Sequence, residues 1–138
     1  MRITFDKYIC IMILIIIITN MKKVLVVEDN PLNMELVLEI LKSQGFSAFE
    51  AVDGEDAINQ IEKETFDLIL MDIELPGIDG MEVTRIIKNR YPTIPVIALT
   101  SYAMKGDKEK FLAAGFDEYM SKPIDMLQFM NRLEKYRK

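Results

Sequence analysis

Side chains that could take part in chemistry stand directly after four short apolar runs of this sequence. They are Glu28 and Asp29 after the first run, Asp72 after the third, Thr100 after the fourth and Lys122 after the fifth. If these positions meet, two carboxylates about 4 Å apart repel each other by roughly 4 kcal/mol at an effective dielectric of ~20, so the cluster needs a cation. Oxygen donors without histidine or cysteine favour a hard ion, Mg²⁺ above all. Lys122 would then offer a positive charge to an anion held beside the metal.

The spacing of apolar residues predicts the elements that bring these side chains together. Asn30 before Pro31 predicts the N-cap and first residue of a helix that ends before Gly45. The pattern repeats and predicts strands over 24–27, 47–51, 68–71, 96–100 and 118–121 and helices over 31–44, 54–63, 80–89, 105–114 and 124–135. Such alternation indicates an α/β fold, a parallel sheet with helices on both faces and ligands beyond the carboxyl ends of the strands. The five reactive side chains, which follow four of these strands, all fall at that edge.

The composition excludes several classes of protein. The 138 residues include no histidine and only Cys10 as cysteine, which excludes Ser-His-Asp catalysis, histidine-ligated zinc and an intrachain disulfide. The net charge is −5, and because residues 1–20 carry a net +1, the rest of the chain carries −6. Nucleic-acid binding relies on clustered Lys and Arg, so we expect no nucleic acid as partner. Single-cysteine usage and the absence of a cleavage site predict a cytoplasmic protein.

Residues 1–20 differ in character from the rest of the sequence. Tyr8 to Ile18 is an unbroken apolar run, which as a helix would cover only about half of a ~30 Å hydrocarbon core. The residues after it provide no small-x-small cleavage site. We expect Met21 to be the working start, residues 1–20 to be an extension outside the fold, and 21–138 to form the domain. The alternative is a peripheral tether, with membrane contact only if residues 1–20 are retained.

Four segments together resemble receiver domains of two-component response regulators. They are VLVVEDN, LILMDIELPGIDG, IPVIALTSYAM and YMSKPID, and the resemblance runs from about Lys22 to the C-terminus. The segments EDNPLNM and TSYAMKGD are most similar to single-domain regulators of the DivK type and to receivers of hybrid kinases. The resemblance implies a flavodoxin-like, doubly wound, five-stranded parallel sheet with strand order 2-1-3-4-5.

The resemblance also implies roles for the acidic residues. Asp72 would be the phosphoacceptor, and Asp29 and Asp72 would bind Mg²⁺ together with the backbone carbonyl of Glu74. Glu28 stands where many members have Asp, which leaves open whether it binds the metal directly or through water. A receiver catalyses its own phosphorylation and slow dephosphorylation and is not otherwise an enzyme.

Thr100 and Lys122 would contact the phosphoryl group, and Tyr119 would be the aromatic switch that responds to it. Each has a plainer interpretation when taken alone. Thr100 could bond its own backbone, Lys122 could be a solvated charge before a turn, and Tyr119 could be a core residue. Their joint placement at successive strand ends favours the functional interpretation.

The partners implied are a histidine kinase or histidine phosphotransfer protein and a downstream protein target. On the first helix after residue 21, Met34 and Leu38 lie near the polar edge and could dock, with Ile124, against the helices that bear the donor histidine. A wide core stripe is the alternative for Met34 and Leu38. Two residues beyond Asp72 and Thr100, Glu74 and Tyr102 would border the path of a hydrolytic water, and we expect Tyr102 to shield it.

Three other functions fit parts of the pattern. A receiver descended from a hybrid kinase could act as a relay or phosphate sink. A haloacid-dehalogenase-like phosphatase also uses an aspartyl nucleophile after a strand, but it needs an Asp where this sequence has Glu74. A flavodoxin-like FMN carrier needs a hydroxyl and glycine phosphate loop after the first strand, where Glu28 and Asp29 would repel phosphate.

Overall fold

The computed structural model describes residues 2–101 and 107–137. Within them, five parallel strands form one sheet with the order β2-β1-β3-β4-β5. The strands are β1 (Lys23–Val27), β2 (Ser47–Ala51), β3 (Leu68–Asp72), β4 (Val96–Thr100) and β5 (Glu118–Ser121). Their β-branched and aliphatic side chains are almost fully buried in β1, β3 and β4, as expected for central strands covered on both faces. The predicted fold class and strand order are confirmed.

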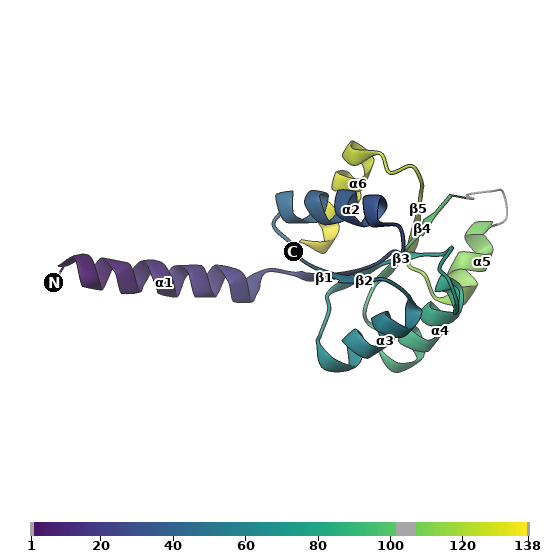
Figure 1. Cartoon of the computed structure of the whole chain (residues 1–138), viewed down its shortest axis with the longest axis horizontal. Helices are drawn as coiled ribbons and strands as arrows, with labels where there is room; N and C mark the ends of the chain where they lie inside the picture. Colours follow the sequence, from purple (N-terminus) through teal and green to yellow (C-terminus); the bar gives the residue numbers. More distant parts are fainter. Residues whose placement is uncertain (1, 102–106, 138) are drawn as a thin grey trace.

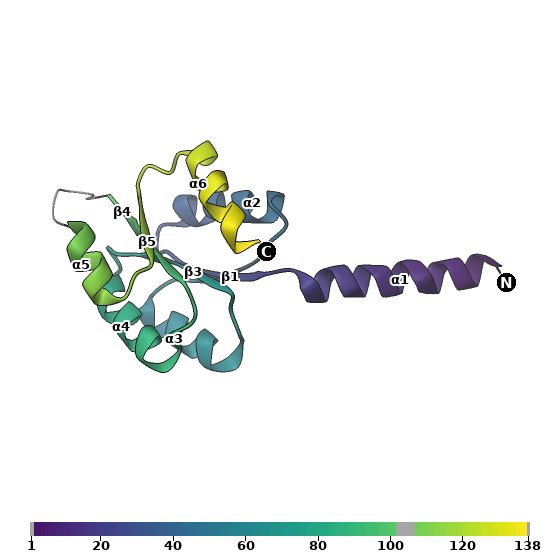
Figure 2. The ribbon, with the colours of Figure 1, turned by 180° about the vertical axis from the view of Figure 1, so that it is seen from behind.

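Helices cover both faces of this sheet (Figure 1). The helices are α1 (Arg2–Asn20), α2 (Pro31–Ser43), α3 (Gly54–Lys63), α4 (Gly80–Arg90), α5 (Asp107–Ala114) and α6 (Met126–Leu133), followed by a 3₁₀ turn, η1 (Glu134–Tyr136). One face carries α2 and α6, and the other carries α3, α4 and α5 (Figures 1 and 2). Each reactive strand end therefore opens into the loop that leads to the next helix.

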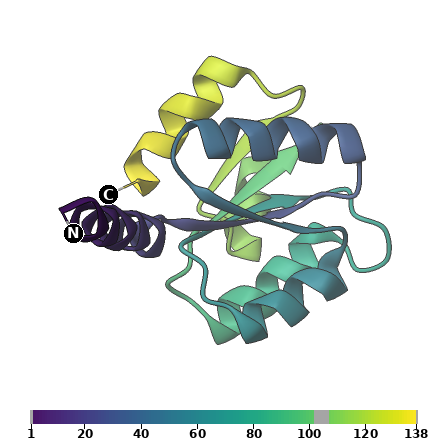
Figure 3. The ribbon, with the colours of Figure 1, turned by 60° about the vertical axis from the view of Figure 1, so that its left-hand side comes forward.

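Two apolar clusters, one on each face, fix these helices to the sheet. On one face Val37 and Ile40 of α2 and Phe129 of α6 pack on alternate residues of the central strands. On the other face Ile61 of α3 and Ile87 of α4 pack on the residues between them. Because side chains alternate along each strand, every strand contributes residues to both clusters. Figure 3 shows the resulting three layers, with the sheet between two layers of helices.

Helix boundaries follow from local capping chemistry. The Asn30 side chain accepts hydrogen bonds from the N–H groups of Leu32 and Asn33 at the start of α2, with Pro31 in the first turn. After α2 the chain turns at Gly45, whose φ of +85° lies in the left-handed region that glycine tolerates best.

The structure differs from the sequence prediction at the start of the last helix. The last helix begins at Met126 and not at Ile124, because the Asp125 side chain accepts a hydrogen bond from the N–H of Gln128 and caps the helix there. Ile124 instead lies half-buried against the core of the α2 and α6 face. The predicted start of the fifth helix at Lys105 lies outside the described residues, which begin again at Asp107.

Residues 2–20 form the helix α1, which projects away from the sheet at the amino end of β1 (Figure 1). Its apolar side chains from Tyr8 to Ile18 are exposed, between 39% and 64% for the large ones among them. In the part of the chain that the structure describes, no helix is long and apolar enough to cross a membrane. That residues 1–20 lie outside the domain stays a prediction.

Candidate functional site

An ion-paired cluster of buried groups lies at the carboxyl edge of the sheet. Asp72 is the last residue of β3, and Glu28 follows β1, its neighbour in the sheet. Both are 2% exposed. The Lys122 ammonium, which follows β5, lies 2.9 Å from Glu28 Oε2 and 3.1 Å from Asp72 Oδ2. Three side chains separated by up to 94 positions in the sequence therefore meet, as their strand ends predicted.

Glu28 and Asp72 also belong to an acidic cluster that could hold a metal ion. Glu28, Asp29 and Asp72 each offer a carboxylate oxygen, and these oxygens lie within 4.8 Å of one another. Asp29 is exposed, so the cluster is open to solvent on one side. An all-oxygen donor set of this kind suits a hard cation such as Mg²⁺, and the residues present fit that ion.

Glu28 is oriented by residues that the sequence analysis did not assign to the site. Its Oε1 accepts a hydrogen bond from the backbone N–H of Asn30 at 3.2 Å and one from Asn33 Nδ2 at 3.5 Å. Asn30 was predicted only as a helix cap, yet its backbone N–H also holds the carboxylate. Only the backbone geometry of the loop before α2 could have indicated this contact.

The charges of the cluster shift the pKa values of its members. Burial raises the pKa of the Glu28 carboxyl above its usual range, the Lys122 hydrogen bond opposes this rise, and the charge of Asp72 adds to it. Burial disfavours the charged form of Lys122, but Glu28 and Asp72 outweigh burial and raise the pKa of Lys122. Lys122 therefore stays protonated near neutral pH, with its ammonium in contact with the carboxyl groups of both Glu28 and Asp72.

Thr100 ends β4, next to the strand that carries Asp72, and is 1% exposed. Its hydroxyl donates a hydrogen bond to Glu74 Oε1 at 3.3 Å, and the N–H of Ser101 donates to the same oxygen at 3.2 Å. The backbone N–H of Glu74 in turn donates to Asp72 Oδ1 at 3.0 Å. Glu74 is thus held against the site by these hydrogen bonds, although the residue is exposed. Tyr102 lies outside the described residues.

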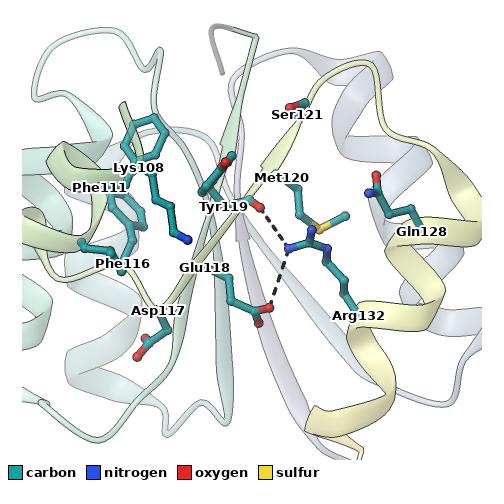
Figure 4. Close-up of a pocket in the computed structure, with 11 residues that line it drawn as sticks. Lys108, Phe111, Phe116, Asp117, Glu118, Tyr119, Met120, Ser121, Gln128 and Arg132 are labelled. Carbon is teal, nitrogen blue, oxygen red and sulfur yellow. Dashed lines mark hydrogen bonds and ion pairs between the residues drawn. The ribbon is translucent and has the colours of Figure 1, made fainter. Parts of the chain in front are cut away.

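Tyr119 on β5 lines a cleft of about 500 Å³ between α5, β5 and α6 (Figure 4). Its half-buried ring lies 5.5 Å from that of Phe111, centroid to centroid. Arg132 of α6 donates a hydrogen bond to the Tyr119 backbone carbonyl at 3.2 Å and pairs with Glu118. Because Tyr119 pairs in register with Ala98, two residues before Thr100, both side chains lie on the same face of the sheet.

The three predicted docking residues have different surroundings. Met34 is 7% exposed and packs in the core beneath α2, and it also lines the groove that Leu38 borders. Leu38 is half-buried and lines a groove of about 390 Å³ between α2 and β2, which begins at Glu28 and Asp29. Ile124 lies half-buried next to the start of α6.

Comparison with known families agrees with this geometry. The family model of the response regulator receiver domain matches residues 24–134. The chain belongs to this family. Flavodoxin-like FMN carriers share this strand order, so the sheet alone does not separate them from receiver domains. The family match favours the receiver domain over both the FMN carrier and the phosphatase.

Known relatives of this receiver domain include response regulators and the receiver domain of a sensor histidine kinase. The polar-differentiation response regulator DivK of Brucella anthropi is 40% identical over 117 residues, which cover 83% of this chain and 95% of the relative. The receiver domain of a sensor histidine kinase from Pseudomonas aeruginosa, solved with a magnesium ion in its active-site cleft, is 36% identical, with a TM-score of 0.76 over 84% of this chain and 97% of that one. The receiver domain of Ssk1, solved with the histidine phosphotransfer protein Ypd1 from Saccharomyces cerevisiae, is 26% identical, with a TM-score of 0.79 over 85% of this chain and 89% of that one.

Proposed function

We propose that Asp72 of this receiver domain accepts a phosphoryl group from a phosphohistidine of a partner protein, and that the modified chain then signals by contact with a downstream protein. The partner would be a histidine kinase or a histidine phosphotransfer protein, the class to which Ypd1 belongs by its name. The proposal depends above all on one observation, the buried Asp72 carboxylate 3.1 Å from Lys122 at the carboxyl edge of the sheet.

The proposed transfer needs little covalent chemistry from the protein. An Asp72 carboxylate oxygen attacks the phosphorus, the P–N bond to the partner's imidazole breaks, and the freed imidazole nitrogen takes a proton from solvent. Lys122, already in contact with Asp72, offsets negative charge on the transferred oxygens. Burial of the pair strengthens this attraction compared with its strength in water.

The acidic cluster would hold Mg²⁺ during this reaction. Asp29, Asp72 and the backbone carbonyl of Glu74 are the proposed ligands, and Glu28 would act through a bound water. When bound, the ion supplies additional neutralisation of the phosphoryl oxygens. Incubation with acetyl phosphate and Mg²⁺ tests the proposal: intact-protein mass spectrometry should detect one added phosphoryl group per chain, and none when Mg²⁺ is removed with a chelator. An unmodified chain in the presence of Mg²⁺ would contradict it.

Thr100 and Tyr119 would convert the modification into a change of surface. A phosphoryl group on Asp72 offers new acceptors to the Thr100 hydroxyl, and a shift of this buried hydroxyl changes the space beside Tyr119 on the same face of the sheet. The cleft of Figure 4 would then change shape, and the downstream protein would bind to the changed surface.

Thr100→Ala separates phosphorylation from this response. We expect the variant to be phosphorylated by acetyl phosphate at a rate within about fivefold of the parent chain, since it loses one neutral hydrogen-bond donor. The NMR signals of the Tyr119 ring should shift on phosphorylation in the parent chain and stay in place in the variant. An equal shift in both chains would refute the coupling.

The groove beside α2 is the proposed docking site for the phosphoryl donor. It starts at the acidic cluster and has Pro31, Met34, Leu38 and Val52 among its apolar residues. Three carboxylates, of Glu35, Glu39 and Glu50, and one ammonium, of Lys42, border it. An apolar helix face with flanking basic residues would complement it. A donor histidine on such a helix would lie near Asp72.

Leu38→Glu is expected to slow transfer from the cognate phosphohistidine protein by about tenfold or more, because it places a charge within the apolar part of the groove. Phosphorylation by acetyl phosphate, which needs no docking, should be unchanged. Leu112→Glu is the matched control, since Leu112 is 53% exposed on α5, away from this groove. If the phosphoryl group is transferred to Leu38→Glu at the parent rate, the donor does not dock in this groove.

A further inference from the structure

The Glu74 side chain bridges the ends of two strands at the site. Glu74 lies two residues after Asp72, and its backbone N–H is tied back to the Asp72 carboxylate. Its own carboxylate reaches across to the end of β4, where Oε1 accepts hydrogen bonds from the Thr100 hydroxyl and the Ser101 N–H. Two donors from consecutive residues thus converge on one carboxylate oxygen.

These two donors are the groups that an anion on Asp72 would need. β3 and β4 are adjacent, and Asp72 pairs in register with Leu99, directly before Thr100. Lys122, which follows β5, also contacts Asp72. Thr100 at the end of β4 and Ser101 directly after it are therefore the donors beside Asp72 on the neighbouring strand. A phosphoryl oxygen and a carboxylate oxygen are acceptors of the same kind, anionic and able to take charge-assisted hydrogen bonds. They cannot both accept from these groups in full.

We propose that Glu74 is a built-in competitor of the phosphoryl group, an internal carboxylate that holds the Thr100 and Ser101 donors until phosphorylation of Asp72 displaces it. The inference rests on the proposed role of Asp72 as phosphoacceptor and adds a regulator of that same site. Two effects act together: the bound carboxylate occupies the donors, and its negative charge opposes the incoming anion. Glu74 therefore raises the threshold for phosphorylation and stabilises the unphosphorylated arrangement of Thr100.

The test uses the full chain and beryllofluoride, a phosphoryl mimic that binds to a carboxylate in the presence of Mg²⁺. We expect Glu74→Ala to bind beryllofluoride about tenfold more tightly than the parent chain, as measured by titration. The variant leaves the Thr100 and Ser101 donors to the anion and removes a nearby negative charge. Glu74→Gln should give an intermediate affinity, because its amide oxygen still accepts hydrogen bonds but carries no charge. Phosphorylation by acetyl phosphate, in which the P–O bond to acetate breaks and the Asp72 O–P bond forms, should accelerate in the same order.

Glu55→Ala is the matched control, because Glu55 is an exposed carboxylate near the start of α3 and its removal changes the net charge equally. It should leave the beryllofluoride affinity unchanged. Hydrogen exchange of the Ser101 amide provides a readout without any ligand, and exchange should be faster in Glu74→Ala than in the parent chain.

The outcomes separate this inference from the proposed function. If the parent chain binds beryllofluoride and Glu74→Ala binds it equally or more weakly, the competitor role is overturned while the phosphoacceptor role stands. If the Glu55 variant matches the Glu74 variant, the effect is one of net charge and the competitor role is again overturned. If no chain binds beryllofluoride or accepts a phosphoryl group, the proposed function and this inference fail together.

Discussion

Asp72→Asn is expected to abolish phosphorylation of the chain by acetyl phosphate and Mg²⁺. The amide nitrogen and oxygen of Asn are weak nucleophiles compared with a carboxylate, and the substitution also removes one oxygen ligand and one negative charge from the acidic cluster. Glu28 also contacts Lys122, but it follows β1 and not β3, the strand that pairs with β4 and its terminal Thr100, so Glu28 is not placed to replace Asp72 among the same groups. Mass spectrometry should detect no added phosphoryl group at times when the parent chain is fully modified.

The fold should survive this substitution, which makes the loss interpretable. Asn is nearly isosteric with Asp, and its side-chain oxygen can still accept the hydrogen bond from the Glu74 N–H. Lys122 keeps its ion pair with Glu28 at 2.9 Å. Asp125→Asn is the matched control, because Asn caps helices as well as Asp does and this residue lies at the start of α6. Labelling of Asp72→Asn equal to that of the control would refute the assignment of the phosphoacceptor.

The parts of this structure that the sequence predicts are those that depend on local pattern. The runs that form β1, β3 and β4 are apolar at nearly every position, which only a strand buried on both faces requires. Strand ends then place Glu28, Asp72 and Lys122 at one edge, because all strands of a parallel sheet point the same way. Topology alone therefore predicted that these side chains meet, whereas the ion pairs of Lys122 with Glu28 and Asp72 were not part of that prediction.

The parts that the sequence did not predict depend on loop conformation. The path from Asp72 to Gly80 brings the Glu74 carboxylate to Thr100 and Ser101, a contact set by backbone angles that have no periodic signature. The start of α6 is a similar case, since both Ile124 and Met126 fit the apolar pattern and only the cap formed by Asp125 distinguishes them. Burial of Met34 depends on how far α2 rotates towards the sheet, which its sequence spacing leaves open.

Gly80 lies at the start of α4 in close contact with the backbone of the proposed phosphoacceptor. A Cβ atom at Gly80 would lie 2.2 Å from the carbonyl oxygen of Asp72 and 2.9 Å from the Cα of Ile73. Both are backbone atoms, so no side-chain rotation can relieve the clash. The N–H of Gly80 also donates to the Ile73 carbonyl at 3.2 Å, which holds the loop closed at this point.

Gly80→Ala should therefore destabilise the chain by about 3 kcal/mol, the upper part of the range for overpacked sites, and lower its melting temperature by roughly 10 °C. Gly45→Ala is the matched control: Gly45 has a left-handed φ of +85° but no atom within 4 Å of the added Cβ. It should cost only about 1 to 2 kcal/mol of backbone strain. Thermal unfolding of the three chains measures the difference, and equal losses in the two variants would contradict the close contact.

The same substitution also tests how tightly the loop after β3 controls chemistry. Relief of the clash must move either α4 or the backbone of Asp72, and a displacement of about 1 Å at a reacting carboxylate can cost on the order of a hundredfold in rate. We expect phosphorylation of Gly80→Ala by acetyl phosphate to fall by at least tenfold at a temperature where the variant is still folded, while Gly45→Ala keeps the parent rate. A destabilised Gly80 variant with the parent rate would mean that α4 moves and Asp72 stays in place.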